Sequence, residues 1–410
     1  MSPSAPSSDP SRPSLTPPPF HSPFEQPEVV PGAAIPRADA PAHAFGQRPA
    51  VSARWGRSAP LWVSGLVVLV AVAVVGYFLN AIGPAASLIG MVLALVPLAV
   101  VLFAVRVIDR WEPEPVGLVV AALAWGTFVA IGITLGFDLL LLSAFGPDSD
   151  FVAAVVSPVL QAPVVEEVAK GLGVYVIFLS ARRAFDGPVD GIVYGALVGA
   201  GFAFTENIQY FALSYIEGGA ADTTATFFVR GILSPFAHVM FTSVTGFALG
   251  LAARRGARAG AAFGPWLLGM AGAIVLHAFW NGSAVFGDFF ALYLTLQVPL
   301  FALFILGLVA LRREEARLTR TRLAEYAAAG WFTEQEVDML ATGRGRKAAL
   351  AWAGSLRGDR TELMKGFIAD ATALAAARQR AISGRDPHAV HDEHALLERT
   401  TAARAAMFAP

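Results

Sequence analysis

The sequence predicts an all-α polytopic membrane protein with about eight transmembrane helices, followed by a soluble helical C-terminal region. Hydrophobic residues make up 55% of the chain and charged residues only 15%, unlike an ordinary soluble protein. The apolar residues gather in runs of ~20 or more, the length that a helix needs to cross ~30 Å of hydrocarbon. The loops between these runs alternate between basic loops and loops without Lys or Arg.

Residues 1–58 are rich in Pro, Ser and Ala and are predicted to be a disordered cytoplasmic tail, because they hold too few apolar residues to form a core. The first apolar run begins near Leu61, far behind this leader, so we expect a retained membrane helix rather than a cleaved signal peptide. The chain has no cysteine and a net charge of −1, so disulfides and thiolate sites are excluded and nucleic acid is not an expected partner.

The transmembrane domain is expected to cover residues 59–312. Its predicted spans are 61–80, 86–106, 117–137, 151–180, 189–213, 226–252, 262–285 and 289–311. Arginines precede the first span and follow the second, fourth, sixth and eighth, while the alternate loops hold none. Arg230, just inside the sixth span, is the one exception. The positive-inside rule then predicts a multi-pass protein of the plasma membrane with both termini in the cytoplasm.

Residues 313–410 are predicted to form a cytoplasmic helical region. The stretch TEQE at 333–336 resembles a capping box, and Gly330 and Gly343 are expected to separate helices. Further helices are predicted over 361–382 and 392–406.

Ionisable residues interrupt four of the apolar spans. An ionisable group at bilayer depth is costly, and its default interpretation is a functional site. These residues are Glu166 and Glu167 in the fourth span, Glu206 in the fifth, His238 in the sixth and His277 in the seventh. The structural alternatives are a charge pair near a helix end, a satisfied core histidine and an interhelical hydrogen bond.

Neighbouring residues support a polar cavity. Pro163 and Pro235 each stand three residues before an ionisable residue, where a proline frees backbone carbonyls that need polar surroundings. Lys170 lies one helical turn after Glu166 and can compensate its charge. Asn281 lies one turn after His277, where it could donate to an oxyanion or fix the tautomer of that histidine. Gly191, Gly195 and Gly199 recur every four residues and predict a close-packed helix face.

Two hydrolytic chemistries fit this constellation. A carboxylate in a poorly solvated cavity can act as general base on water, while His and Asn donors stabilise the oxyanion of amide hydrolysis. Alternatively, His238, His277 and Glu206 supply a two-histidine, one-carboxylate zinc shell, with another glutamate as base. Both lead to cleavage of a peptide bond inside a membrane.

Three motifs, EEVAK (166–170), FAFTE (202–206) and HAFWN (277–281), occur in this order on successive spans. With DRWEPEP (109–115), they resemble the PrsW family, which belongs to the wider group of CAAX-processing and Abi-type intramembrane proteases. The resemblance covers about residues 60–311.

The resemblance implies an intramembrane endopeptidase, labelled a metalloprotease in this family, that cleaves membrane-associated proteins, with site-1 cleavage of an anti-sigma factor as the best-known role. Glu166 would act on the hydrolytic water and the His277/Asn281 pair would lie at the oxyanion. Glu206 stands where CAAX-type relatives carry a histidine, so its role stays open between second carboxylate, proton shuttle and metal ligand. The candidate catalytic residues are Glu166, Glu167, Glu206, His277 and Asn281, and Lys170 and Phe202 are supporting residues.

Two other functions compete with this hypothesis. Intramembrane Glu and His also form proton relays in proton- or cation-coupled transporters. Transporters often consist of two related halves, whereas here the polar residues cluster in the fourth to seventh spans. A scaffold acting through its tail and C-terminal region is the third hypothesis, and it leaves the Glu166–Glu167 pair without a purpose.

Overall fold

The computed structural model describes residues 59–110, 113–147, 149–182, 184–383 and 388–408. These residues form helices, turns and bends and contain no strand, which confirms the all-α class. The chain divides at Val309/Ala310 into two compact units, each described by itself below. The predicted tail, residues 1–58, lies outside the described residues.

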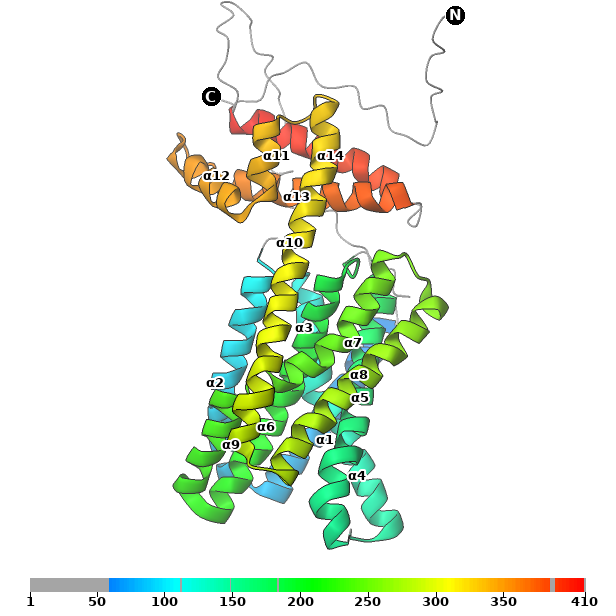
Figure 1. Cartoon of the computed structure of the whole chain (residues 1–410), viewed down its shortest axis with the longest axis vertical. Coiled ribbons are helices and arrows are strands. Elements are labelled where there is room, and N and C mark those ends of the chain that lie inside the picture. Colours follow the sequence, from blue (N-terminus) through cyan, green and yellow to red (C-terminus); the bar gives the residue numbers. More distant parts are fainter. Residues whose placement is uncertain (1–58, 111–112, 148, 183, 384–387, 409–410) are drawn as a thin grey trace, which may run out of the picture. The chain divides into compact units, whose positions relative to one another are not determined.

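The first unit consists of helices that are interrupted by short π-helical segments (Figure 1). In chain order these are α1 (Ala59–Tyr77), η2 (Phe78–Ile82), α2 (Pro84–Ile108), α3 (Val116–Ala124), η3 (Trp125–Ala130), α4 (Ile131–Phe145), η4 (Val152–Gln161), α5 (Ala162–Ser180), α6 (Pro188–Phe227), η5 (Phe228–Leu233), α7 (Ala237–Arg254), α8 (Ala259–Phe286), α9 (Phe289–Leu292), η6 (Tyr293–Gln297) and α10 (Val298–Ala328), the last of which continues past the unit boundary.

Six helical stretches among the described residues are long and apolar enough to cross a membrane. One of them, Pro188–Arg254, is 67 residues long and contains two of the predicted spans. Its helix is interrupted at Gly219, where φ is +64° and ψ is −147°, a conformation that glycine adopts without a steric penalty. A further apolar helix, Val67–Ile82, is shorter and corresponds to the first predicted span. The chain is therefore a polytopic α-helical membrane protein.

Helix α6 is the centre of this unit and packs against α2, α3, η3, α5 and α7 (Figure 1). Its glycines let α7 approach backbone to backbone, as their spacing predicted. A Cβ atom at Gly191 would lie 2.0 Å from the carbonyl oxygen of Gly246, and one at Gly195 would lie 2.6 Å from that of Thr242. At Gly199 the nearest atom would be the His238 carbonyl oxygen, at 2.5 Å. The glycine face therefore holds His238 close against α6.

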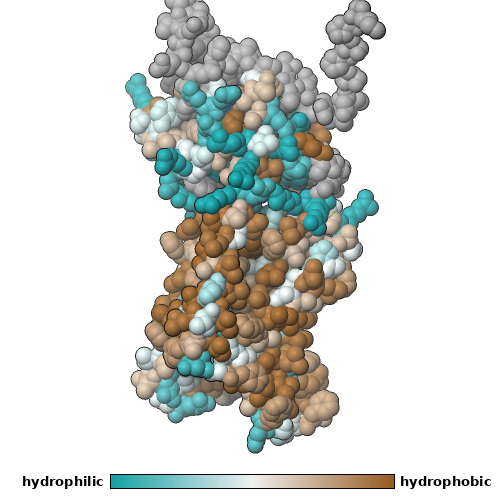
Figure 2. Space-filling view, in the orientation of Figure 1, coloured by the Kyte–Doolittle hydropathy of each residue, from teal (hydrophilic) through white to brown (hydrophobic). Residues whose placement is uncertain are grey.

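The outward faces of the other helices are apolar. Large hydrophobic side chains such as Phe103, Leu140, Leu268 and Leu303 are more than half exposed, and Figure 2 shows continuous hydrophobic surface over helices of this unit. Only Pro188–Arg254 is mainly buried among the membrane-length helices, at 67%. Lipid therefore solvates the outer faces, while α6 and α7 lie in the interior, where polar residues of α5 and α8 also lie buried.

The second unit contains α11 (Glu334–Ala341), α12 (Gly343–Ser355), α13 (Thr361–Ser383) and α14 (Ala389–Met407), together with the end of α10. The predicted capping box is confirmed: Thr333 Oγ1 accepts the Glu336 N–H at 3.1 Å, and Glu336 accepts the Thr333 N–H at 2.8 Å. Helices α13 and α14 confirm the two predicted C-terminal helices. A core that includes Tyr326, Phe332 and Phe367 holds this unit together.

Candidate functional site

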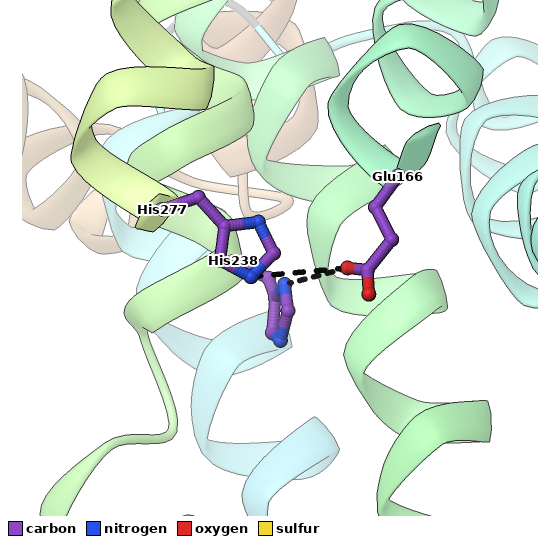
Figure 3. A group of neighbouring side chains, drawn as sticks. All are labelled: Glu166, His238 and His277. Atoms are coloured by element: carbon purple, nitrogen blue, oxygen red, sulfur yellow. Dashed lines mark ion pairs between the residues drawn. The ribbon is translucent and has the colours of Figure 1, made fainter. Parts of the chain in front are cut away.

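The structure brings the five intramembrane ionisable residues together. Glu166 and Glu167 come from α5, Glu206 from α6, His238 from α7 and His277 from α8. All but Glu206 are at least nine-tenths buried, and the Glu206 side chain is 15% exposed. Figure 3 shows the Glu166 carboxylate pointing toward both imidazole rings, which approach each other edge to face with their centroids 5.0 Å apart.

Lys170 lies at the centre of this group and is completely buried. Its ammonium lies 2.6 Å from Glu167 Oε1 and 3.3 Å from Glu166 Oε2, and it donates to His238 Nδ1 at 3.1 Å. The ammonium also lies 4.1 Å from the centroid of the Phe202 ring. Phe202, which was expected to be a supporting residue, thus contacts Lys170. The charge-pair alternative required Lys170 to reach the membrane–water interface, but its side chain is buried. Its ammonium instead pairs with the two glutamates of the site.

Glu167 is a fully satisfied buried carboxylate. Its Oε1 accepts from Lys170 and lies 3.1 Å from His277 Nδ1, and its Oε2 accepts the Thr242 hydroxyl at 3.1 Å. Because these contacts occupy both oxygens, Glu167 orients its neighbours rather than offering a free oxygen.

The contacts define the tautomers of both histidines. His277 Nδ1–H donates to Glu167, which leaves Nε2 as an acceptor 3.9 Å from Glu166 Oε2. His238 Nδ1 accepts from Lys170 and lies 4.0 Å from Glu166 Oε2, and its Nε2–H donates to Glu206 Oε2 at 2.9 Å. Each imidazole is thus held by a carboxylate on one nitrogen, and its other nitrogen lies about 4 Å from Glu166.

Glu206 has a cationic partner that the sequence did not identify. The Arg230 guanidinium forms an ion pair with Glu206 Oε2, donates from Nε to Asn207 Oδ1 at 2.8 Å and stacks 3.9 Å from the centroid of the Tyr210 ring. Arg230 had stood out only as an exception to the charge pattern of the loops. A cation inside an apolar span requires a partner, but nothing along the chain selects one of the three glutamates.

A cavity of about 230 Å³ adjoins these residues. Its polar lining comes from Glu206, Asn207, Arg230, His238, His277 and Asn281, and its apolar lining includes Phe241, Trp280 and Phe289. Glu166 does not line the cavity itself, but its carboxylate lies 3.9 and 4.0 Å from the two histidines that do. A polar cavity beside the ionisable residues was expected from the two prolines.

The proline before Glu166 explains how Asn281 is held. In η4 the N–H of Ala162 bonds to the carbonyl of Ser157, five residues back. The same register would pair residue 163 with Pro158, but Pro163 has no N–H. Asn281 Nδ2 donates to the Pro158 carbonyl instead, at 2.8 Å. The structure thus places Asn281 in the cavity wall against η4, while Glu167, rather than Asn281, fixes the tautomer of His277.

The proline before His238 breaks the helix completely. The π-helix η5 ends at Leu233, and α7 begins only at Ala237. The Ser234 N–H and hydroxyl both donate to the Val229 carbonyl, at 3.1 and 2.7 Å, and Tyr293 donates its hydroxyl to the Leu233 carbonyl at 2.7 Å. This break lets η5 present Arg230 and α7 present His238 to the same carboxylate. π-Helical segments are frequent at functional sites.

The donor set suits a metal ion. One ligand atom from each of Glu166, His238 and His277 lies within 4.8 Å of the other two. Both histidines have the outer carboxylate partner that metal-bound histidines usually have. Tetrahedral zinc ligands lie roughly 3.4 Å apart, so the site would contract slightly and Lys170 would give up its contact with His238. The expected zinc shell contained Glu206 instead, but the geometry places Glu206 on the far nitrogen of His238.

Comparisons with known proteins agree with the motifs. Residues 114–304 match a family described as the PrsW family intramembrane metalloprotease. A protein named Protease PrsW from Geobacillus kaustophilus is 33% identical over 148 residues, which are 35% of this chain and 58% of that protein. Those of Bacillus subtilis and Clostridioides difficile are 32% and 28% identical over 146 and 155 residues, covering 35% and 38% of this chain and 60% and 62% of theirs. No solved structure matches the chain.

Fold and site together define a polytopic α-helical membrane protein with a buried glutamate–histidine–lysine centre. Residues 114–304, the part of the chain that is similar to the PrsW family, contain every member of that centre. The chain spans about three fifths of the length of the relatives that it matches.

Proposed function

We propose that this protein is an intramembrane endopeptidase that hydrolyses a peptide bond in membrane-associated proteins. The observation that carries the proposal is the convergence of the Glu166 carboxylate with two imidazole nitrogens, 3.9 and 4.0 Å away, beside a polar cavity. Two partners of one water molecule, each at about 2.8 Å, lie roughly 4 Å apart. The spacing therefore suits a water that both Glu166 and a histidine hold. The PrsW relatives are named proteases, which supports the same activity.

In this proposal Glu166 is the general base. The water oxygen attacks the carbonyl carbon of the scissile bond while Glu166 takes the water proton. When the C–N bond breaks, Glu166 returns this proton to the leaving amine, so that one water and one peptide bond yield a carboxylic acid and an amine. Glu167 keeps the proton of His277 on Nδ1, and the Nε2 lone pair then orients the water.

The oxyanion needs a hydrogen-bond donor. With its proton on Nδ1, His277 donates from Nε2 only when the ring is doubly protonated, so the expected oxyanion role of His277 requires a second proton. The Asn281 amide lines the cavity, and one of its two N–H groups remains after the bond to Pro158. We assign the oxyanion contact to this N–H, which acts in a site of low dielectric where a single donor is worth about 3–4 kcal/mol.

Zinc is the metal for which this donor set is suited. Glu166, His238 and His277 would hold it, and a bound zinc would supply Lewis-acid activation of the water. In this alternative Glu166 would be a ligand rather than the general base. Glu167 and Glu206 would then orient the two imidazoles in the way that they do here.

The substrate is proposed to be a membrane protein that reaches the cavity in the bilayer, with an anti-sigma factor as the family-based candidate. The proposed location is the plasma membrane with both termini in the cytoplasm, as the arginine pattern of the loops indicates.

A comparison of membrane proteomes tests this function. Cells carrying the wild type and Glu166→Gln are compared for fragments and intact levels of every membrane protein. Glu217→Gln, an exposed glutamate in the membrane unit, is the matched control. We expect one or a few proteins to lose their fragments and accumulate intact in Glu166→Gln alone. Matching proteomes for all three under envelope stress contradict the proposal and favour the transporter hypothesis, for which proton flux in liposomes is then measured.

A further inference from the structure

We propose that Arg230 is a positioning residue of the hydrolytic site, acting on His238 through Glu206. This inference rests on the proposed function and assigns a role to Glu206, which the motifs left open.

The first argument is the way in which Arg230 is held. Its guanidinium contacts Glu206, Asn207 and the face of Tyr210, all on α6. Three different contacts fix the position and the plane of the side chain, which is only 24% exposed. A cation inside an apolar segment is costly, so this arrangement is more than a solvated surface pair.

The second argument is the continuity of the contacts. Glu206 Oε2 accepts from both Arg230 and His238 Nε2–H. A carboxylate paired with a guanidinium stays ionised and stays in place, and it therefore keeps the His238 proton on Nε2. The Nδ1 lone pair is then left to face Lys170 and Glu166. Arg230 thus acts with Lys170, which donates to Nδ1, to keep the His238 proton on Nε2.

The third argument is the balance of charge. Three carboxylates, Glu166, Glu167 and Glu206, face two permanent cations, Lys170 and Arg230. Without Arg230, the single ammonium of Lys170 would have to compensate all three carboxylates. Glu206 would then lose the guanidinium that holds its carboxylate in place against His238 Nε2.

The backbone supports the same arrangement. Arg230 lies in η5, where the wide turn is closed by the two bonds from Ser234 to the Val229 carbonyl. The helix breaks between η5 and α7, so Arg230 and His238 lie on two separate helical segments. Each segment can therefore place its own side chain against Glu206.

Steady-state kinetics on the full-length protein in proteoliposomes test the inference, using a substrate identified in the proteome comparison. For Arg230→Gln we expect at least a tenfold fall in kcat with KM changed less than about twofold, and Arg230→Lys restores most of kcat. Arg312→Gln is the matched control, because Arg312 also pairs with a glutamate and its side chain is 26% exposed. This control is expected to keep wild-type kinetics. A rise in KM with unchanged kcat would mean a direct substrate contact and would overturn the positioning role.

A double-mutant cycle separates positioning from general stability. If Arg230 acts through Glu206, Arg230→Gln adds little to the loss caused by Glu206→Gln. Equal losses on both backgrounds overturn the inference. Should Arg230→Gln lower the melting temperature in detergent, the cycle is repeated with Arg230→Lys. Inactive Glu166→Gln beside fully active Arg230→Gln rejects this inference alone, whereas active Glu166→Gln rejects the proposed function.

A spectroscopic measurement reports the tautomer directly. The ring ¹⁵N spectrum of histidine-labelled protein, with the His238 signals assigned by their loss in His238→Gln, should show a proton on Nε2 in the wild type. We expect this signature to change in Arg230→Gln and to persist in Arg312→Gln. A His238 signature that is identical in all three proteins contradicts the proposed action on His238.

Discussion

Lys170 compensates the charge of the buried carboxylates in the apolar membrane unit. It is a fully buried lysine, yet its ammonium has two carboxylates and one imidazole nitrogen as neighbours. Breaking such a pair leaves an uncompensated buried charge, which is more costly than the pair is stabilising. The stability of the site therefore depends on keeping all partners together.

We expect Lys170→Met to lower the free energy of unfolding by about 3–5 kcal/mol and to abolish cleavage, because Glu166 and Glu167 then face each other without a cation. Thermal or denaturant unfolding in detergent measures the loss. Lys365→Met is the control, since Lys365 pairs with Glu362 with its side chain 55% exposed, and removing an exposed pair costs about 0–1 kcal/mol. Similar losses in the two variants would contradict this account of Lys170.

At this scale the sequence could identify the members of the site but not their pairing. Glu166, Glu206 and His277 stand out because they interrupt apolar runs, and this signal needs no tertiary information. The ion pair of Glu206 with Arg230 depends on the break before α7, and the bond of Lys170 to His238 depends on how α5 faces α7. Neither can be read from spacing along the chain, because the partners lie 24 and 68 residues apart.

Among the elements, α6 carries most of the architecture. Its glycines allow α7 to approach so closely that His238 lies beside Glu206. The periodicity of Gly191, Gly195 and Gly199 predicted this close packing before any partner was known. The π-helical segments could not be predicted in the same way, because an extra residue in a turn leaves the apolar pattern of a membrane helix unchanged.

Gly195→Ala should destabilise the protein by about 1–3 kcal/mol and reduce cleavage, since the added Cβ would lie 2.6 Å from the Thr242 carbonyl oxygen and force α6 and α7 apart. Gly136→Ala, at a position with nothing within 4 Å, is the control. It should leave stability unchanged or raise it slightly, because alanine favours helix by up to about 1 kcal/mol. Melting temperatures that fall equally would refute the close-packing argument.

Asn281→Leu should loosen η4, because the Pro158 carbonyl loses its only side-chain donor among the described residues. Hydrogen exchange of the amides in 152–161 is expected to speed up severalfold. Asn80→Leu removes a comparable bond to a helix carbonyl, that of Gly76, on an exposed surface and should leave these amides unaffected. Unchanged exchange in Asn281→Leu would show that η4 does not depend on this bond.

For the whole molecule, the sequence defined the class and the membrane part, because long apolar runs and alternating arginines are properties of the chain that packing does not alter. The number of spans was less well defined, since Pro188–Arg254 is one long, mostly helical stretch that is interrupted at Gly219 and again between Leu233 and Ala237. The orientation in the membrane remains a prediction from the arginine pattern.

The absence of cysteine makes this orientation directly measurable. Ala221→Cys lies in the part of α6 just after Gly219, which is expected outside, and Ser355→Cys lies in the region expected in the cytoplasm; both positions are exposed. In intact cells a membrane-impermeant maleimide should label the first variant only, and after permeabilisation it should label both. Labelling of Ser355→Cys in intact cells would invert the topology.

The most direct test of the central claim is the origin of the oxygen in the cleaved product. Purified protein in liposomes is incubated with its substrate in H₂¹⁸O, and the new C-terminal carboxylate is analysed by mass spectrometry. If Glu166 activates water for peptide hydrolysis, this carboxylate gains one ¹⁸O atom in a single turnover with the wild type, and Glu166→Gln forms no fragment. Fragments without the label, or fragments formed equally by Glu166→Gln, would contradict the account.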